Sequence, residues 1–291
     1  MARRPRVLWL QGVTCNGDSH SFLNASEMPQ ILEKFHFVYH PLFETGYTLE
    51  SIAKEYFDID ILVIEGGLLK KGFKRAGVES FELIERYASI AKQIVCAGNC
   101  ASFGGISRKM DRNVTGAAFC EQEPTGLLAS YSSKIINLPG CPIHPQWLVY
   151  ALEMNRHGQT IELDEFRRPV ELYGYTVHEG CTRNEYFEWK IDAKGFGVRE
   201  GCLFYEHGCQ GPFTHGSCNK ILWGGVSSKT RAGMPCIGCT EPGFPSTNLF
   251  ETKTLMSIPA KMPLGVPKRA YLTMTGIAKA FKIERLEKKK F

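Results

Sequence analysis

The chain has 291 residues, of which 43% are hydrophobic and 22% are charged, a composition that is typical of a folded globular protein and excludes a disordered or collagen-like chain. No apolar run approaches the roughly 18–20 residues that span a membrane. Residues 261–291 hold nine Lys or Arg and two Glu, which gives this segment a net charge of +7, against +5 for the whole chain. The rest of the chain is therefore nearly neutral, which excludes a broadly basic, nucleic-acid-binding protein.

The first half of the chain alternates short apolar runs with segments in which apolar residues recur at helical spacing. This alternation favours a parallel sheet covered on both faces, and near-continuous apolar runs are typical of buried parallel strands. Pro29 is expected to shorten or kink the first helix. In chain order, we predict a strand at 6–11, a helix at 21–35, a strand at 59–65, a helix at 80–91, strands at 93–97 and 134–138, and a helix at 145–155.

The second half, from about residue 167, differs in composition. It has few regular runs, many Gly and Pro residues, and six cysteines between 181 and 239. A segment this irregular needs something other than a broad apolar core to hold it together, and bound metal is the obvious candidate. Residues 271–289 are predicted to form a terminal helix, although Gly276 weakens it.

Eleven cysteines are many for a chain of this size, and the odd number rules out complete internal pairing. Arg3 and Arg4 are followed at once by a strand-like run, where a secretory leader would have an apolar segment and a cleavage site. We therefore expect a reducing compartment, in which such cysteines usually bind metal or do redox chemistry. Cys96 is interpreted as a small buried hydrophobe, and Cys120 as buried or close to the first site; neither is counted as a ligand.

Three cysteines share a position relative to the predicted strands. Cys15, Cys100 and Cys141 each follow the carboxyl end of a strand, in a turn shaped by Gly or Pro. In open α/β sheets, ligands bind outside these ends. We therefore expect the three thiols to converge on one site; the alternative is three unrelated loop thiols.

Three thiolates leave one vacancy on a four-ligand cluster. Asp18 is the natural candidate because it lies three residues after Cys15. A carboxylate is a harder ligand than iron–sulfur clusters usually take. The alternative is that Asp18 only caps a helix that begins near Ser19, which is a common use of Asp.

A second set of candidate ligands opens the second half of the chain. It comprises His178, Cys181, Cys202 and Cys209. One imidazole with three thiolates suits an iron–sulfur cluster and a zinc ion equally well.

The last set comprises Cys218, Cys236 and Cys239. Structural zinc takes four ligands, whereas a three-iron cluster needs three, so the count favours iron and sulfide. His215 is available to complete a zinc site, and His207 is a further spare candidate.

Together these motifs resemble the small subunit of nickel–iron hydrogenases over almost the whole chain. Any one of them alone is weak, whereas the series is specific. The short start and the phrases SFLNA, GCTRNEYFE and SSKTRAGMPC are most similar to the cyanobacterial-type uptake and hydrogen-sensing branch. The motifs that carry the resemblance are VLWLQG at 7–12, AGNCASFGGI at 97–106, INLPGCPIHPQW at 136–147, HEGCTRNEYFE at 178–188, CLFYEHGCQGP at 202–212, CNKILW at 218–223 and PCIGCTEPGFP at 235–245.

The resemblance implies an α/β fold in which a flavodoxin-like parallel-sheet domain, residues 1–166, is followed by a largely irregular cluster-binding domain, residues 167–291. It also implies three iron–sulfur clusters: two 4Fe-4S clusters, proximal and distal, and one medial 3Fe-4S cluster. Carried over residue by residue, the ligands are Cys15, Asp18, Cys100 and Cys141 for the proximal cluster, His178, Cys181, Cys202 and Cys209 for the distal cluster, and Cys218, Cys236 and Cys239 for the medial cluster.

Two departures from the family pattern matter. The usual proximal C-x-x-C is C-N-G-D here, so either Asp18 is the fourth ligand or the site holds a different cluster. The pair Cys202 and Cys209 is one residue further apart than in the common pattern, which should only reshape a loop.

The resemblance further implies an obligate large subunit that contains the nickel–iron centre, so this chain has no catalytic residue of its own and works in a heterodimer. Electrons from hydrogen oxidation enter at the proximal cluster, pass the medial one and leave at the distal one, toward a quinone-linked or cytochrome acceptor. We expect an uptake hydrogenase, with a regulatory hydrogen sensor as the alternative. We expect a cytoplasmic oligomer of heterodimers, with peripheral association at the cytoplasmic face of the membrane allowed.

Two further classes of protein compete with this interpretation. A zinc-stabilised binding module would use the same thiols without sulfide. The related small subunit of respiratory NADH dehydrogenases shares the first fold, but the HEGC and PCIGC motifs of the second half argue against it.

Overall fold

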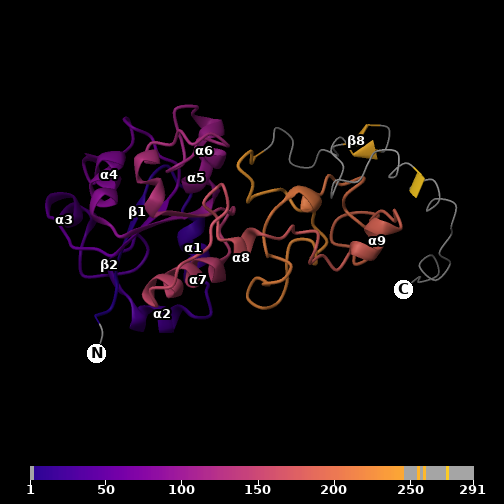
Figure 1. The fold of residues 1–291 in the computed structure, drawn as a ribbon, viewed down its shortest axis with the longest axis horizontal. Coiled ribbons are helices and arrows are strands. Elements are labelled where there is room, and N and C mark those ends of the chain that lie inside the picture. The colour runs from indigo at the N-terminus through magenta and orange to yellow at the C-terminus, as the bar shows by residue number, and fades with distance from the viewer. Residues whose placement is uncertain (1–2, 246–253, 256–257, 260–272, 275–291) are drawn as a thin grey trace.

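The computed structural model describes residues 3–245, 254–255, 258–259 and 273–274. These residues form two parts that lie side by side in Figure 1: a sheet covered by helices, drawn in indigo to magenta, and a loop-rich part drawn mainly in orange. The basic terminal segment and nearly all of the helix predicted at 271–289 lie outside the described residues.

The regular elements are short and concentrate in the first part. There they are, in chain order, β1 (Arg6–Gln11), α1 (Gly17–Leu23), α2 (Met28–Lys34), β2 (His36–Tyr39), α3 (Leu49–Lys54), β3 (Ile61–Glu65), β4 (Lys74–Arg75), β5 (Val78–Glu79), α4 (Ser80–Ile90), β6 (Gln93–Ala97), α5 (Gly98–Phe103), α6 (Gly105–Met110), a 3-10 helix (Ala129–Lys134), β7 (Ile135–Leu138), α7 (Pro145–Arg156) and α8 (Val170–Tyr173). They are followed by α9 (Asn184–Glu188), a second 3-10 helix (Gly211–Phe213), β8 (Thr254–Leu255) and β9 (Ile258–Pro259).

Five parallel strands form the central sheet, in the order β2-β1-β3-β6-β7. Counted within this sheet alone, the order is 2-1-3-4-5, which is the doubly wound order of flavodoxin-like folds. Every neighbouring pair runs parallel. The predicted α/β class, with a flavodoxin-like parallel sheet, is therefore confirmed.

Helices cover the sheet on both faces because alternate strand residues point to opposite sides. Leu8 and Leu10 of β1 pack in one core with residues of α3 and α4. Val7 and Trp9 pack in the other core with residues of α1, α2 and α7. Figure 1 shows α3 and α4 on one side of the strands and α2 and α7 on the other. This double burial is why each strand needs a near-continuous apolar run.

The structure corrects the predicted elements in several places, among them the turn expected at Cys100, which is the helix α5. The helix expected at 21–35 is two helices, α1 and α2, because Pro29 lies in the first turn of α2, where its missing N–H has no intrahelical partner to lose. The edge strand β2 and the helix α3 were not predicted. β2 has only four residues, and α3 begins at a capping box between Thr48 and Ser51.

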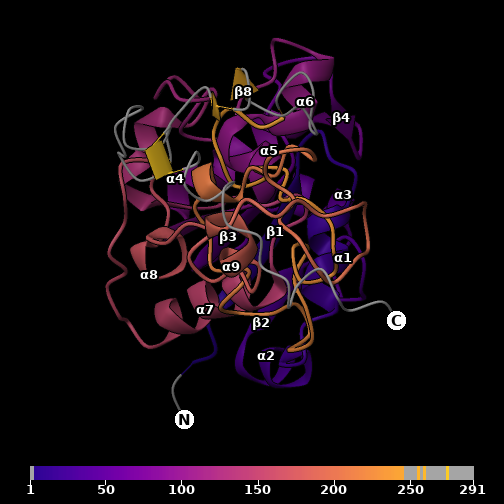
Figure 2. The ribbon, with the colours of Figure 1, turned by 90° about the vertical axis from the view of Figure 1, so that its right-hand side faces the viewer.

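The second part has little regular structure, as predicted. Figure 2, which views the molecule from the side of this part, shows mostly loops around α9 in front of the sheet. Its apolar core is small, and three of the buried members are cysteines packed with Phe187, Leu203 and Phe204. Thiols thus occupy positions that larger apolar side chains fill in the first part.

No helix in the described part of the chain is long and apolar enough to span a membrane.

Candidate metal centres

Four residues gather beyond the carboxyl ends of the parallel strands; we call Cys15, Asp18, Cys100 and Cys141 the proximal set. Cys15 lies in the loop after β1, Asp18 in the first turn of α1, Cys100 in α5 directly after β6, and Cys141 in the turn after β7. The charges of Cys239, Cys100, Asp18 and Cys15 all act on the Cys141 thiol, so the other three members of the set, and Cys239, lie near it. Parallel strands end at one edge of the sheet, and this topology brings the set together.

The carboxylate of Asp18 lies between the turns that carry Cys100 and Cys141. The Ile143 backbone N–H, in the Cys141 turn, donates to Asp18 Oδ1 at 2.7 Å. On the other side, a Cβ placed on Gly98 would be 2.1 Å from Asp18 Oδ2, so the carboxylate rests directly on the Gly98 backbone. Gly98 also has a φ of +84°, which favours glycine, so no other residue fits this contact.

Asp18 is not the cap of α1, because the helix begins at Gly17 and the Asp18 carboxylate is engaged by the Ile143 backbone. The helix is capped by Glu65, whose Oε1 accepts from the backbone N–H groups of Asp18 and Ser19 at 3.1 Å each. Glu65 is fully buried at the end of β3. This role was not predicted, and the available signal in the sequence was a carboxylate that ends an otherwise apolar run.

Burial dominates the electrostatics of the proximal set. It raises the pKa of Asp18 to about 8, although the hydrogen bond from Ile143 opposes the rise. It also raises the pKa of Cys141 to about 12 and shifts the pKa of Cys100 upward. Ligands that are deprotonated in such a place need a compensating positive charge, which a bound metal supplies. The set therefore fits a cationic iron core in number and chemistry, with Asp18 buried, Cys100 and Cys141 half-buried and Cys15 exposed.

His178, Cys181, Cys202 and Cys209, the distal set, border one small cavity in the second part. Burial raises the pKa of Cys202 and that of Cys209 to about 12. Burial lowers the pKa of His178, so its imidazole is neutral near pH 7, which is the form that binds metal. This set also fits a metal cluster.

Arg183 is a buried cation that borders the same cavity. Its Nε donates to the Thr230 carbonyl at 2.8 Å and its Nη1 to the Gly201 carbonyl at 2.6 Å, and Nη2 donates to the Val198 carbonyl. Among the described residues its hydrogen bonds go to backbone carbonyls and to no carboxylate. Since Arg183 follows Cys181 by two residues and binds the residue before Cys202, it ties two candidate ligands together.

We expect Arg183→Leu to destabilise the distal site. The substitution leaves buried carbonyls without donors, at a cost of about 1–3 kcal/mol each, and releases the loop before Cys202. Purified complexes should show less iron per heterodimer and a lower thermal inactivation temperature. Arg199→Leu, in the same loop and exposed, is the matched control and should leave both unchanged. Full iron content in Arg183→Leu would contradict the assignment.

Cys218, Cys236 and Cys239, the medial set, border a cavity of about 450 Å³. Burial raises the pKa of each of the three thiols, and the neighbouring thiolates raise that of Cys218 further. Cys141 of the proximal set borders the same cavity. One buried and two half-buried thiols around a space of this size fit a cluster with three thiolate ligands.

The three sets follow one another through direct contacts. The Cys236 backbone N–H donates to Cys209 Sγ at 3.3 Å, which joins the medial set to the distal set. Burial raises the pKa of Cys239, and a hydrogen bond from the Cys141 backbone opposes this rise, so the medial and proximal sets also touch. The sets therefore form a continuous series from the edge of the sheet into the second part.

The two spare histidines have other partners. His215 is engaged by Glu241, whose Oε1 is 3.1 Å from the His215 ring and accepts the His215 backbone N–H at 2.6 Å. The His207 ring packs against Phe196 at 5.2 Å between centroids.

Cys96 is fully buried in β6, which confirms its interpretation as a small hydrophobe. Cys120 is half-buried and pairs with the Glu123 backbone. Across residues 3–245 and the short described stretches beyond, no three Cys, His, Asp or Glu side chains lie close enough to share a single metal ion.

Comparisons with known proteins identify two families along the chain. The family described as the C-terminal part of the NiFe/NiFeSe hydrogenase small subunit matches residues 173–251. The family described as the 20 Kd subunit of NADH ubiquinone oxidoreductase matches residues 15–154. The chain is thus of the oxidoreductase class, with a first half common to two kinds of subunit and a second half that is specific to one.

Relatives that match most of the chain decide between the hydrogenase family and the NADH ubiquinone oxidoreductase family. The periplasmic [NiFe] hydrogenase small subunit of Solidesulfovibrio fructosivorans is 32% identical over 83% of this chain and 79% of its own length. The hydrogenase-2 small chain of Escherichia coli strain K12 is 31% identical over 83% and 68%. The solved actinobacterial-type NiFe-hydrogenase from Ralstonia eutropha H16 superposes with a TM-score of 0.71 at 26% identity, over 99% of this chain and 92% of that one.

The chain belongs to the small subunits of nickel–iron hydrogenases, which carry iron–sulfur clusters and act as oxidoreductases together with a nickel–iron large subunit. The resemblance seen in the sequence is confirmed at this level. The cyanobacterial-type branch stays a prediction.

The predicted cytoplasmic location is wrong. Relatives from Solidesulfovibrio fructosivorans, Nitratidesulfovibrio vulgaris and Desulfomicrobium baculatum are periplasmic hydrogenase small subunits, which points to the periplasm or the outer side of the membrane. The prediction rested on thiol count and on the first residues of the chain. Neither determines the compartment, because thiols that bind metal are withdrawn from disulfide formation in any compartment.

Proposed function

We propose that this chain is the electron-transfer subunit of an uptake hydrogenase, with two domains, at residues 1–166 and 167–291. The observation that carries the proposal is the unbroken series of thiol sets, joined at Cys141 with Cys239 and at Cys209 with Cys236. A binding module stabilised by separate zinc ions has no need for its sites to touch. A conductor of electrons does, because transfer weakens steeply with distance.

The proximal set would hold a 4Fe-4S cluster, the medial set a 3Fe-4S cluster and the distal set a second 4Fe-4S cluster. These clusters supply one-electron redox chemistry when bound. The chain's own residues hold them in place and exclude water: Cys209 and Cys236 are buried, and Glu65 holds the first turn of α1, which carries Asp18. Water exclusion and backbone hydrogen bonds to the sulfurs are the means by which a protein adjusts cluster potentials.

The partner is the large subunit with the nickel–iron centre, which this chain requires for activity. The uptake role is supported by the relatives named as periplasmic hydrogenase subunits. The alternative, a regulatory hydrogen sensor, uses the same clusters. Hydrogen-dependent reduction of a quinone or cytochrome acceptor by the purified complex, at rates far above those of signalling, supports the enzyme. Peripheral membrane association and a higher oligomer of heterodimers belong to the same proposal.

Metal analysis of the anaerobically purified complex tests the proposal. We expect about eleven iron atoms and matching acid-labile sulfide in the small subunit, from two four-iron clusters and one three-iron cluster. Stoichiometric zinc without sulfide would refute it. Iron that belongs to the large subunit is subtracted by measuring that subunit alone.

A further inference from the structure

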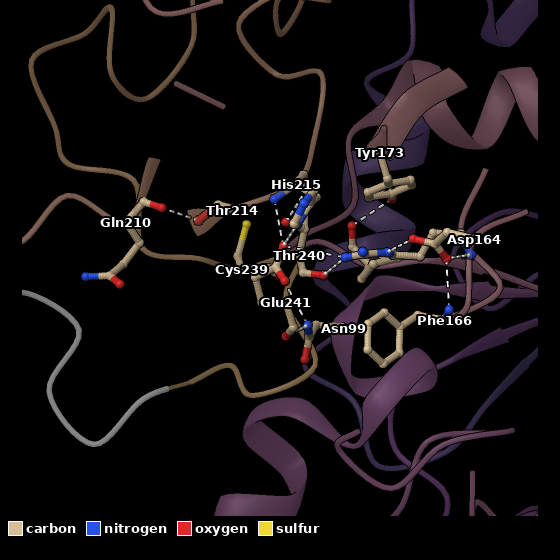
Figure 3. Close-up of polar contacts among 12 residues, drawn as sticks. Asn99, Asp164, Phe166, Tyr173, Gln210, Thr214, His215, Cys239, Thr240 and Glu241 are labelled. Carbon is tan, nitrogen blue, oxygen red and sulfur yellow. Dashed lines mark hydrogen bonds and ion pairs between the residues drawn. The ribbon is translucent and has the colours of Figure 1, made fainter. Parts of the chain in front are cut away.

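Beyond the ligands themselves, a buried polar network joins the two parts of the chain where the proximal and medial sets meet (Figure 3). Its members are Asn99, Arg168, His215, Thr240 and Glu241, with Asp164 and Tyr173 at the margin. Asn99 comes from α5 and adjoins the proximal ligand Cys100. Thr240 and Glu241 directly follow the medial ligand Cys239.

Asn99 bonds the backbone around a ligand of each set. Its backbone N–H donates to the carbonyl of Gly140, the residue before Cys141, at 2.8 Å. Its side-chain Nδ2 donates to the carbonyls of Cys239 and Glu241, at 3.0 Å each. One residue therefore contacts the turn of the proximal ligand Cys141 and the turn of the medial ligand Cys239.

The cost of this arrangement is visible in the same side chain. Asn99 is only 2% exposed, and its Oδ1 has no hydrogen-bond partner among the described residues. A buried polar atom without a partner destabilises the fold, and such groups need an explanation other than stability. The amide is held with its two donors toward carbonyls of the second part.

Arg168 also contacts the turn after Cys239. It is 3% exposed, its Nη1 donates to the Thr240 carbonyl at 3.2 Å, and its Nε binds Asp164 Oδ2 at 2.8 Å. Glu241 Oε1 lies 3.5 Å from Arg168 Nη1 and accepts the His215 backbone N–H. The Arg168 guanidinium also lies over the rings of Phe166 and Tyr173, 5.2 Å and 5.5 Å from their centroids. The turn after Cys239 is thus fixed by side chains of the first part.

We propose that Asn99 is a positioning residue that sets the gap between the first and second electron carriers, with Arg168 as its support. This inference rests on the proposed function, since it takes the proximal and medial sets as cluster ligands. Asn99 touches no acceptor or substrate and acts through the backbone of Cys141 and Cys239. If its donors are lost, the Cys239 turn is free to move away from Cys141, and the gap between the two carriers widens.

Asn99→Asp tests the proposal in the purified heterodimer, because aspartate keeps the shape of the side chain and replaces its donors with acceptors that repel the two carbonyls. Two readouts follow the gap directly: the magnetic splitting between the paramagnetic proximal and medial clusters, and the rate at which the medial cluster is reduced after hydrogen is added. We expect a smaller splitting and slower reduction. Asn113→Asp, on an exposed loop, is the matched control and should behave as the unaltered protein.

The outcomes separate the two proposals. Absence of iron and sulfide in the unaltered complex would refute the proposed function itself. With both clusters present, an unchanged splitting and an unchanged rate in Asn99→Asp would overturn the positioning role alone. If the Asn99→Asp complex fails to assemble, the same measurements are made on Arg168→Lys. The lysine keeps a positive charge beside Asp164 but cannot donate to the Thr240 carbonyl as the arginine guanidinium does. A reduced splitting there supports the proposal, and an unchanged one overturns it.

Discussion

Replacing Asp18 with alanine is expected to remove one iron atom, or the whole proximal cluster, from the hydrogenase complex. The Asp18 carboxylate is buried between the turns of Cys100 and Cys141, and burial raises its pKa to about 8. A carboxylate in this place is stable only with a positive charge beside it, and an iron bound by Asp18 would supply that charge. Iron analysis together with the low-temperature electron paramagnetic resonance spectrum of the reduced complex measures the effect.

Two further substitutions at the same position separate a ligand from a structural hydrogen-bond acceptor. Asp18→Cys should keep a four-iron cluster but change its potential and its response to oxygen, because a thiolate is a softer ligand than a carboxylate. Asp18→Asn keeps an oxygen that accepts the Ile143 N–H. If that hydrogen bond is the only role of Asp18, the iron content of Asp18→Asn should change little. If Asp18 binds iron, Asp18→Asn should lose as much iron as Asp18→Ala. Asp58→Ala, at an exposed surface pair with Arg3, is the control. Unchanged proximal spectra in both Asp18→Ala and Asp18→Cys would eliminate the ligand role.

Removing the iron and sulfide from the complex is expected to unfold the second part of the chain while the sheet survives. The two cores on either side of the sheet are extensive, whereas the core of the second part is small and contains three cysteines. Without bound metal, nothing offsets the cost of holding the thiols of Cys202, Cys209 and Cys236 together in this core. Metal binding therefore contributes to the free energy of folding of the second part.

Hydrogen exchange resolved by peptide measures this effect. Amides between residues 177 and 245 should lose protection after anaerobic chelation, while those of β1, β3, β6 and β7 should keep it. Reconstitution with iron and sulfide is the control and should restore protection. Equal protection of both parts in the iron-free protein would show that the apolar cores alone stabilise the second part.

The sequence alone was sufficient to predict four of the five strands of the sheet, all except β2, and to group the candidate ligands into sets whose medial and distal members border common cavities. The strands are buried on both faces, so their apolar runs are continuous and easily recognised, as at Arg6–Gln11 and Gln93–Ala97. The thiols are recognisable because cysteine is rare and because turns rich in Gly and Pro surround it. The compartment was predicted wrongly, since no local pattern of residues encodes it.

Only the tertiary structure decided how the sets are held. Glu65 caps a helix that begins 48 residues earlier in the chain, at Gly17, and the Asn99 amide binds a carbonyl 140 residues away, at Cys239. Such contacts follow from the packing of the two parts against each other, and neither partner carries a local signal of the other. The residue types determine which metal chemistry is available, whereas the arrangement of the two parts determines that the three sets lie next to one another.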